Sequence, residues 1–485
     1  MSASRQLPEG WAWATLDEFT QGRGQSLDPS RHKAETFELY SIPGFDAGAP
    51  ELLNGSAIGS AKQMVNAGDV LLSKINPRIN RVWLVGEDRG FRQIASTEWI
   101  VFPRNDYING DYLKFFLRQH HVRNFLASNV SGVGGSLMRI KASTLDGYPI
   151  PVAPRDEQRR IVEKIEALFA ELDKGEESLR QVQKLLARYR QSVLKAAVTG
   201  ELTADWRARH AGNLEHGRDL LARILKARRE NWQGRGKYKE PVEPDTTNLP
   251  ELPEGWVWAS IDQLFQVFGG ATPSRRDPAN WGGNIPWVSS GEVAFCRIRD
   301  TKEKITEKGY RSCSTRVHPK GTVLLAMIGE GKTRGQAAIL DIPACNNQNS
   351  AAIRVSETEI PPEYVYYYLM GRYETSRREG QGGNQPALSG ERVKSFAMPL
   401  SSIDEMREIV SRLRSSLDMA SEIEAVCESE LSRAAVVRQA VLKYAFSGKL
   451  VPQDLNDEPA SELLARIRAQ RASESRKTTR RAATA

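Results

Sequence analysis

The chain has 485 residues, of which 26% are charged and 40% are hydrophobic, and a formal net charge of +8. This length predicts more than one hydrophobic core, and the modest positive charge favours a polyanionic partner while excluding the extreme excess of a histone-like protein. Four widely spaced cysteines indicate neither a zinc knuckle nor a disulfide framework, and no stretch is apolar enough for a signal peptide or a membrane span. We therefore expect a soluble, cytoplasmic, multidomain protein.

An internal repeat organises the chain. The segment LPEGWAWATLDEF, at Leu7–Phe19, returns as LPEGWVWASIDQLF at Leu252–Phe265. YPIPVAPRDEQRRIV is echoed by FAMPLSSIDEMREIV, RQSVLKAAVTGEL by RQAVLKYAFSGKL, and LLARI recurs unchanged. The echoes keep the same order in both halves. The sequence therefore predicts two copies of one unit, related by a pseudo-twofold internal repeat.

Between the echoes, both halves alternate short β-rich runs with glycine and asparagine turns. Strands are predicted at Asp69–Ile75, Thr322–Ile328 and Ala337–Ile342, and helices at Gly110–Leu126 and Pro361–Arg377. The pattern is typical of mixed domains, so we assign the α+β class to both halves.

Two long helices are predicted to follow these mixed regions. From Ile161, apolar or small residues recur at alternating steps of four and three, as in a coiled-coil seam. The second copy repeats the seam less strictly, with Ser416 and Glu430 as weak positions. Prolines before each helix and Gly200 and Gly448 after it give lengths of about 40 to 45 residues. We expect the helices to pack as an antiparallel coiled coil; a simple bundle is the plainer alternative.

Polar loops rich in lysine and arginine interrupt the mixed regions. Arginine can bond guanine through two donors, asparagine and glutamine can pair with adenine, and both patterns suit the major groove of DNA. For any single residue an ordinary solvated loop is the alternative. The candidate DNA-binding residues are Arg23, Lys74, Arg78, Arg81, Ser136, Arg139, Lys141, Thr272, Ser274, Arg275, Arg276, Lys332, Arg334, Asn346, Gln348, Gln381, Asn384 and Gln385.

Catalytic and cofactor signals are weak. AMIGEGKT, at Ala326–Thr333, fits a relaxed phosphate-loop pattern, but the following RGQAAILDIPACNNQ predicts a strand and a turn instead of the helix that a phosphate loop requires. No N/D-P-P-Y/F motif of an adenine methyltransferase occurs, and the six histidines show no metal-binding spacing. We expect no catalytic centre, no cofactor and no metal site.

The combined motifs resemble the specificity subunits of type I restriction-modification systems over nearly the whole chain. The resemblance rests on L-P-x-G-W-x-W at both starts, on the block Pro149–Val162, on the block Arg190–Leu202, and on GATPSR with WGGNIPWVSSGEV at Gly270–Val293. It implies two target recognition domains, each binding one half of a bipartite, asymmetric double-stranded DNA site. It also implies that the helices set the gap and dock two modification subunits, and that ATP-dependent restriction subunits join for cleavage.

On this interpretation the chain divides into six segments. They are a first recognition domain at 1–154, a central helix at 155–200, a short helix and basic, proline-rich linker at 201–250, a second recognition domain at 251–400, a distal helix at 401–450, and a short helix with a basic tail at 451–485. The tail is a candidate for auxiliary phosphate contacts.

One departure from the family pattern lies in the second copy, where Ser401–Met406 replaces the expected Pro-x-x-x-E-Q run. Two other functions remain open at this stage. A stand-alone DNA-binding regulator predicts its own dimer contacts and a helix-turn-helix, and a coiled-coil scaffold predicts no sequence preference in DNA.

Overall fold

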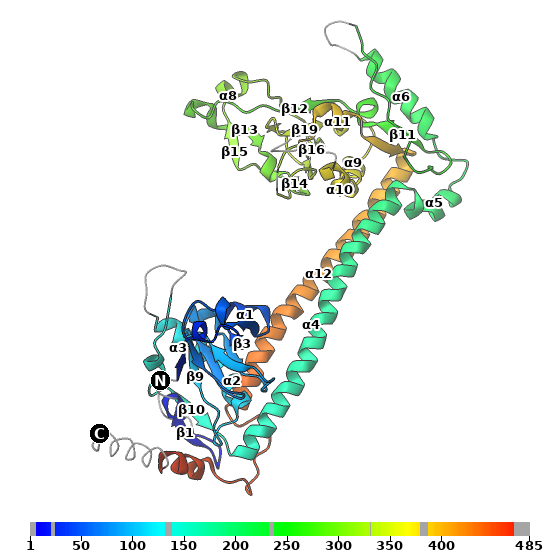
Figure 1. Ribbon diagram of the computed structural model, residues 1–485. Coiled ribbons are helices and arrows are strands. Elements are labelled where there is room, and N and C mark those ends of the chain that lie inside the picture. Colours follow the sequence, from blue (N-terminus) through cyan, green and yellow to red (C-terminus); the bar gives the residue numbers. More distant parts are fainter. Residues whose placement is uncertain are drawn as a thin grey trace. The chain divides into compact units, whose positions relative to one another are not determined.

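The computed structural model describes residues 6–20, 25–130, 138–231, 237–329, 331–378 and 387–469. The chain forms two compact units: unit 1 comprises Met1–Leu179 and Glu428–Ala485, and unit 2 comprises Arg180–Cys427. Two long helices, α4 (Arg155–Val198) and α12 (Ile403–Ala445), contribute residues to both units (Figure 1). Their 44 and 43 residues confirm the predicted lengths, and each unit has the predicted α+β content.

Unit 1 contains three sheets with strand orders β1-β10, β2-β5-β8-β3-β4 and β7-β6-β9. All pairings are antiparallel except β3 with β8. The strands are β1 (Ala12–Thr15), β2 (Ser26–Leu27), β3 (Thr36–Tyr40), β4 (Glu51–Asn54), β5 (Lys62–Met64), β6 (Val70–Ser73), β7 (Val82–Leu84), β8 (Arg92–Ala95), β9 (Trp99–Phe102) and β10 (Pro149–Val152). The helices of this unit, besides its parts of α4 and α12, include α1 (Ile42–Ala47), α2 (Gly110–Leu117), α3 (His120–Ser128), five 3-10 turns, among them η4 (Pro77–Ile79), and a helix at 460–469.

Unit 2 also contains three sheets, with orders β11-β20, β12-β19-β16-β17-β14 and β15-β13-β18. The pairs β13 with β18 and β14 with β17 are parallel. The strands are β11 (Val257–Ser260), β12 (Val267–Gly269), β13 (Trp281–Val288), β14 (Cys296–Ile298), β15 (Glu303–Ile305), β16 (Val323–Ala326), β17 (Ala337–Leu340), β18 (Cys345–Asn346), β19 (Ser350–Ile353) and β20 (Ala397–Leu400). The α-helices are α5 (Ala204–Arg209), α6 (Gly217–Glu230), α7 (Ile261–Leu264), α8 (Glu307–Arg311), α9 (Pro362–Gly371), α10 (Tyr373–Arg378) and α11 (Gly390–Lys394), with parts of α4 and α12.

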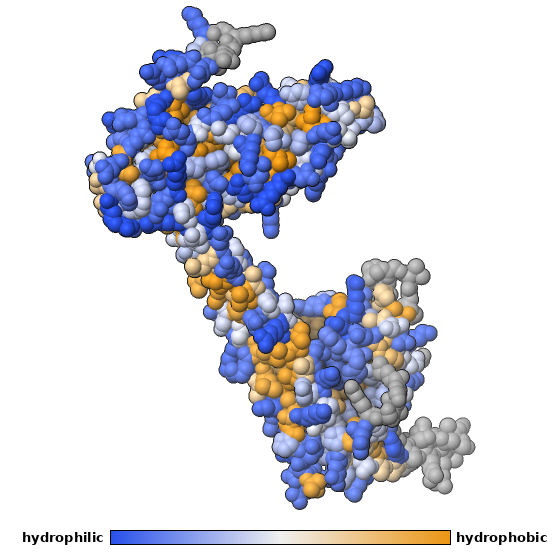
Figure 2. Space-filling model, turned by 180° about the vertical axis from the view of Figure 1, so that it is seen from behind, coloured by the Kyte–Doolittle hydropathy of each residue, from blue (hydrophilic) through white to orange (hydrophobic). Residues whose placement is uncertain are grey.

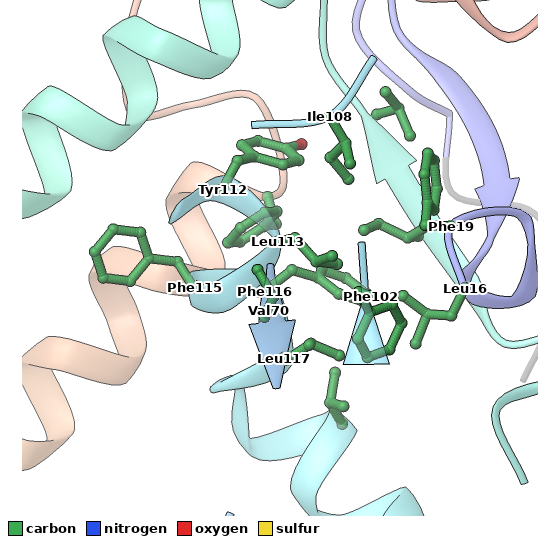
Figure 3. Close-up of a cluster of buried hydrophobic side chains, with 14 of the residues drawn as sticks. Leu16, Phe19, Val70, Phe102, Ile108, Tyr112, Leu113, Phe115, Phe116 and Leu117 are labelled. Carbon is green, nitrogen blue, oxygen red and sulfur yellow. The ribbon is translucent and has the colours of Figure 1, made fainter. Parts of the chain in front are cut away.

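The core of unit 1 forms where α2 packs on the β7-β6-β9 sheet. Figure 3 shows side chains of α2 directed toward Val70 and Phe102 of the sheet, with Leu16 and Phe19 beside them. The buried residues of the last turns of α12, including Leu442, belong to the same cluster. Burial of a large apolar side chain contributes about 1.5 to 3 kcal/mol, so this cluster fixes the sheet against the helices.

In each unit, the same set of contacts joins the start of the mixed region to the first turn of the long helix. In unit 1 the Trp11 indole donates to the buried Glu157 carboxylate at 3.0 Å, and in unit 2 the Trp256 indole donates to Glu405 at 2.9 Å. The two-stranded sheets of the two units also match in register, with Ala12 opposite Val152 in β1-β10 and Val257 opposite Leu400 in β11-β20. The repeated sequence blocks therefore build the same frame twice. The departure at Ser401–Met406 keeps this carboxylate, because Glu405 occupies the place of Glu157.

Each long helix ends at a glycine that the frame requires. Gly200 and Gly448 adopt left-handed φ values of +75° and +67°. A Cβ at Gly200 would meet Pro253 and a Cβ at Gly448 would meet Pro8, so a side chain is excluded by close approach as well as by backbone conformation. The expected helix stops are confirmed, and each stop packs against the leucine-proline motif that opens a mixed region.

Two predicted helices are interrupted. The helix expected at Gly110–Leu126 is split into α2 and α3, because the Asn80 amide donates to the Leu117 carbonyl at 2.9 Å and takes an acceptor that a continuous helix would use. The helix expected at Pro361–Arg377 is split after Gly371, a residue with low helix propensity. The predicted strands are confirmed in shorter form as β6, β16 and β17.

The seam of α4 is buried over only part of its length. Ile161 and Ile165 are fully buried and Leu186 and Val193 nearly so, whereas Tyr189 is 44% exposed. Within the described ranges, no helix is both long and apolar enough to cross a membrane.

Glu157 yields a prediction about stability. Burial raises the pKa of its carboxyl, although bonds from Trp11 and Gln453 oppose the shift. The folded-state pKa lies above the unfolded one, so the contribution of this group to the free energy of unfolding falls as pH rises through the folded pKa. We expect wild type to lose stability relative to Glu157→Gln as the pH rises above about 4.5, measured by thermal unfolding. The opposite trend would contradict this assignment.

The matched substitution Glu157→Ala leaves the Trp11 N–H buried without its acceptor. We expect it to cost about 1 to 3 kcal/mol, and Glu157→Gln to cost less because the amide oxygen still accepts from Trp11.

Candidate nucleic-acid interface

In unit 2, loops from four parts of the sequence meet at one end of the larger sheet. The Met327 N–H, just after β16, donates to the Asn349 carbonyl at 2.8 Å, and the Met327 carbonyl accepts from Leu388 at 2.9 Å. The Ala271 N–H donates to the Asn346 carbonyl at 3.0 Å. We call three of these four loops, residues 270–276, 327–336 and 346–349, the unit 2 loop cluster. Backbone bonds hold these loops together, so their exposed side chains share one surface.

Unit 1 has an equivalent arrangement beyond β6. The Lys74 N–H donates to the Glu98 carbonyl at 2.8 Å, and the Lys74 carbonyl accepts from Ile140 at 3.0 Å. Lys74 follows VLLS as Met327 follows VLLA, and both residues make the same pair of backbone bonds. We call residues 74–81, 96–98 and 138–141 the unit 1 loop cluster. The two clusters occupy one framework position with different side chains.

Of the candidates in unit 1, the structure brings Lys74, Arg78, Arg81, Arg139 and Lys141 to this cluster. Arg78 and Lys141 are exposed, whereas Lys74 is half-buried, bonds the Thr97 carbonyl at 2.7 Å, and has its pKa lowered by burial. Arg139 pairs with the Glu98 carboxylate at 2.8 Å. The surface is therefore mixed in charge. Arg23 and Ser136 lie outside the described residues.

Arg81 differs from the others because its guanidinium is already engaged. It makes two bonds to Asp46, at 2.7 and 2.8 Å, and its side chain is only 10% exposed. The paired arginine holds the pKa of Asp46 below its usual range. This geometry favours a bracing role between α1 and the loop before β7.

In unit 2, Thr272, Ser274, Arg275, Arg276 and Gln348 gather on the loop cluster. The Thr272 hydroxyl bonds the Gln348 side chain at 2.5 Å, which ties two of the predicted loops together. Ser274, Arg276 and Gln348 are exposed. An exposed polar set of this kind can bond base edges or phosphates.

Arg275 lies in a defined orientation. Its guanidinium makes two bonds to Glu303, at 2.7 and 2.8 Å, and lies 4.3 Å from the ring centroid of Trp281. Glu303 raises the pKa of Arg275. Both terminal nitrogens already have a partner, so a base or phosphate would have to share or displace Glu303.

The remaining described candidates differ in burial. Lys332 is exposed, Arg334 is 8% exposed and donates to the Arg377 carbonyl at 2.9 Å, and Asn346 is fully buried with its amide bonded to the Asn347 and Ser350 carbonyls. Asn346 therefore shapes the loop from within. Gln381, Asn384 and Gln385 lie outside the described residues.

Two features of the site were not among the sequence candidates. Glu98 and Glu303 are carboxylates beside the arginines, and a screen for cationic and amide residues passes over them. Trp281 begins the quoted WGGNIPWV segment, but only the structure places its ring against Arg275. The carboxylates and the ring that orient these arginines are therefore evident from the structure and not from the sequence pattern.

The phosphate-loop-like segment has the predicted context. β16 precedes it and β17 follows it, so no helix N-terminus is presented to a phosphate by the residues described here. In the described part of the chain, no group of three or more histidine, cysteine, aspartate or glutamate residues is placed to hold a metal ion. All four cysteines are free thiols.

The chain is similar to known proteins in sequence and in fold. A family model described as the type I restriction modification DNA specificity domain matches residues 253–433. The chain is 30% identical over 182 residues to the specificity subunit of type I restriction enzyme MjaIX of Methanocaldococcus jannaschii, covering 36% of this chain and 41% of that relative. It is 22% identical over 375 residues to the specificity subunit of type I restriction enzyme EcoDI of Escherichia coli, covering 75% of this chain and 77% of that relative.

A solved structure also shares the fold. One chain of a structure concerning complex assembly and conformational transition of the type I R-M system has a TM-score of 0.70 at 20% identity. The match covers 92% of this chain and 100% of the other.

Substitution of Arg81 and of Arg78 tests whether the paired, mostly buried arginine stabilises the fold more than the exposed one does. We expect Arg81→Ala to lower the free energy of unfolding by about 1 kcal/mol, because it removes a forked pair and a mostly buried stem. Arg78→Ala, at an exposed position, should stay within about 0.5 kcal/mol of wild type. Thermal unfolding of both variants checks this, and equal stability of the two would contradict the distinction.

Proposed function

We propose that the two loop clusters of this chain, a type I restriction-modification DNA specificity subunit, bind the two halves of a bipartite, asymmetric site in double-stranded DNA. The recognition domains correspond to residues 1–154 and 251–400. In this proposal the chain carries no catalytic centre, and methylation and cleavage are performed by partner subunits.

The observation that carries the proposal is that the two units share one backbone arrangement but have different side chains in their loop clusters. Lys74 and Glu98 in unit 1 stand where Met327 and Asn349 stand in unit 2, on the same backbone bonds. Lysine suits a phosphate, glutamate can accept from cytosine, and asparagine can pair with adenine. Retention of the frame with exchange of its loop side chains is what two different half-sites require.

We propose that α4 and α12 pack as an antiparallel coiled coil that relates the two recognition domains by a pseudo-twofold repeat. Within unit 1, Arg438 of α12 pairs with Asp173 and Glu176 of α4, at 2.7 and 2.8 Å. Within unit 2, Arg190 of α4 pairs with Glu424 of α12 at 2.7 Å. At ~1.5 Å per residue, helices of this length measure about 65 Å, so they can set the gap between half-sites.

The exposed sides of the long helices suit partner proteins. In unit 2, Leu185, Met419 and Val426 are 59%, 61% and 60% exposed, and in unit 1 Val436 and Tyr444 are 68% and 55% exposed. Figure 2 shows apolar side chains along the surface of the helical segment. Exposed apolar residues of this kind mark interaction sites. We propose that two modification subunits dock there, one for each unit, and that restriction subunits join the resulting complex.

The first test of the proposal is the modified sequence itself. The chain is co-expressed with the modification subunit from its source in a host without DNA methylation, and N6-methyladenine is mapped across the genome. We expect one split motif, with two short defined halves around a fixed undefined gap. Exchange of residues 251–400 for those of a relative should change one half only. An unmethylated genome despite a soluble complex would contradict the proposal.

Helix length gives a second test. Removal of one heptad from the middle of α4 and one from the middle of α12 shortens the helices by about 10 Å, equal to about three base pairs of DNA. We expect the gap in the methylated motif to shorten while both halves stay the same. As a control, replacement of the same heptads by other helix-forming sequences should leave the gap unchanged. An active complex with the original gap after deletion would rule out the helices as the ruler.

A further inference from the structure

In unit 2, one face of α10 holds the loop between β16 and β17. The Tyr373 hydroxyl donates to the Lys332 carbonyl at 2.7 Å, and the Arg377 guanidinium donates to the Gly331 carbonyl at 2.6 Å. Arg334 returns a bond to the Arg377 carbonyl at 2.9 Å. Tyr373 and Arg377 are four residues apart and therefore share a helix face. Three cross-bonds join this short helix to consecutive parts of the loop.

The Tyr373 ring is itself supported from two sides. Gly335 has a φ of +86°, and a Cβ there would approach the Tyr373 ring to 3.3 Å. On another side Phe295 stacks edge-to-face with the ring, with centroids 5.3 Å apart. Phe295 has a φ of +50°, which is costly for a bulky side chain and persists only where the surroundings hold it. One tyrosine is thus packed against a phenylalanine in a costly backbone conformation and against a glycine that a residue with a side chain could not replace without strain.

We propose that Tyr373 is a positioning residue for DNA binding, which holds the β16-β17 loop so that the exposed Lys332 side chain meets a phosphate of the half-site bound by unit 2. This inference rests on the proposed function and adds a residue outside the loops that were expected to contact DNA. Tyr373 acts through the main chain of Lys332, because its hydroxyl proton occupies that carbonyl. With the carbonyl fixed, fewer loop conformations compete with the one that binds, and preorganisation lowers the entropic cost of binding.

The experiment measures the affinity of the complex of this chain with its modification subunit for a duplex carrying the split motif, across a range of salt concentrations. Tyr373→Phe removes only the hydroxyl and should weaken binding about 2- to 10-fold, the effect of one hydrogen bond. Lys332→Ala should weaken binding to a similar degree and make the slope of log affinity against log salt shallower by about one. In the Lys332→Ala background, Tyr373→Phe should have less than about a 2-fold further effect.

Tyr368→Phe is the matched control. Its hydroxyl also donates to a main-chain carbonyl at 2.7 Å, that of Ala397, but in the buried core of unit 2. It should lower thermal stability and leave the affinity of the folded complex unchanged. Arg377→Met, which breaks the neighbouring bond to Gly331, is a second variant and should reproduce the dependence on Lys332.

The outcomes separate the two proposals. If the wild-type complex binds no split motif, the proposed function fails. If wild type binds and Tyr373→Phe binds equally well, the positioning role is wrong. It is also wrong if Tyr373→Phe lowers the affinity as much in the Lys332→Ala background as in wild type. Weaker binding that depends on Lys332, with an unchanged Tyr368→Phe complex, establishes it.

Discussion

Each unit depends on one buried carboxylate at the first turn of a long helix. Glu157 and Glu405 accept an indole N–H from the tryptophan that opens the adjacent mixed region, and each also binds the segment that follows the other long helix. Gln453 donates to Glu157, and Thr203 donates to Glu405 at 2.8 Å. A buried carboxylate is tolerated only when its oxygens are bonded. Three parts of the chain that are distant in sequence must therefore converge for either unit to close.

This constraint explains which parts of the sequence repeat. The Gly-Trp-x-Trp segments supply the indole donors, the Asp-Glu segments supply the carboxylates, and Gly200 and Gly448 allow the helix ends to approach Pro253 and Pro8. Because the frame satisfies its own polar groups, the loops at the far end of β6 and β16 are free to differ, and Lys74 and Met327 show that they do.

The repeated framework of the two units could be predicted from the sequence, because its segments repeat, have a regular hydrophobic period, or are bounded by proline and glycine. The α+β class, both long helices and their glycine stops follow from hydrophobic period, proline and glycine. The breaks inside the two shorter helices could not be predicted, since the first depends on Asn80, an amide more than thirty residues away. The loop candidates show the same limit. Arg78 and Arg81 are equivalent by composition, and only the position of Asp46 decides that one is exposed and the other is held.

Under the proposed function, the arginines of the two clusters would let a protein of modest positive charge discriminate among DNA sequences. Arg139 pairs with Glu98 of its own cluster, and Arg275 pairs with Glu303, the first residue of the neighbouring strand β15. An arginine that is already paired with a carboxylate contributes less binding free energy to a phosphate contact than an unpaired arginine does. Part of the favourable free energy is offset because the carboxylate contact is lost. Non-specific attraction to the DNA backbone would thereby be reduced. A base edge that bonds the guanidinium without displacing the carboxylate would let the arginine keep both contacts. The near balance of 68 basic and 60 acidic residues is consistent with specificity built from local geometry more than from overall charge.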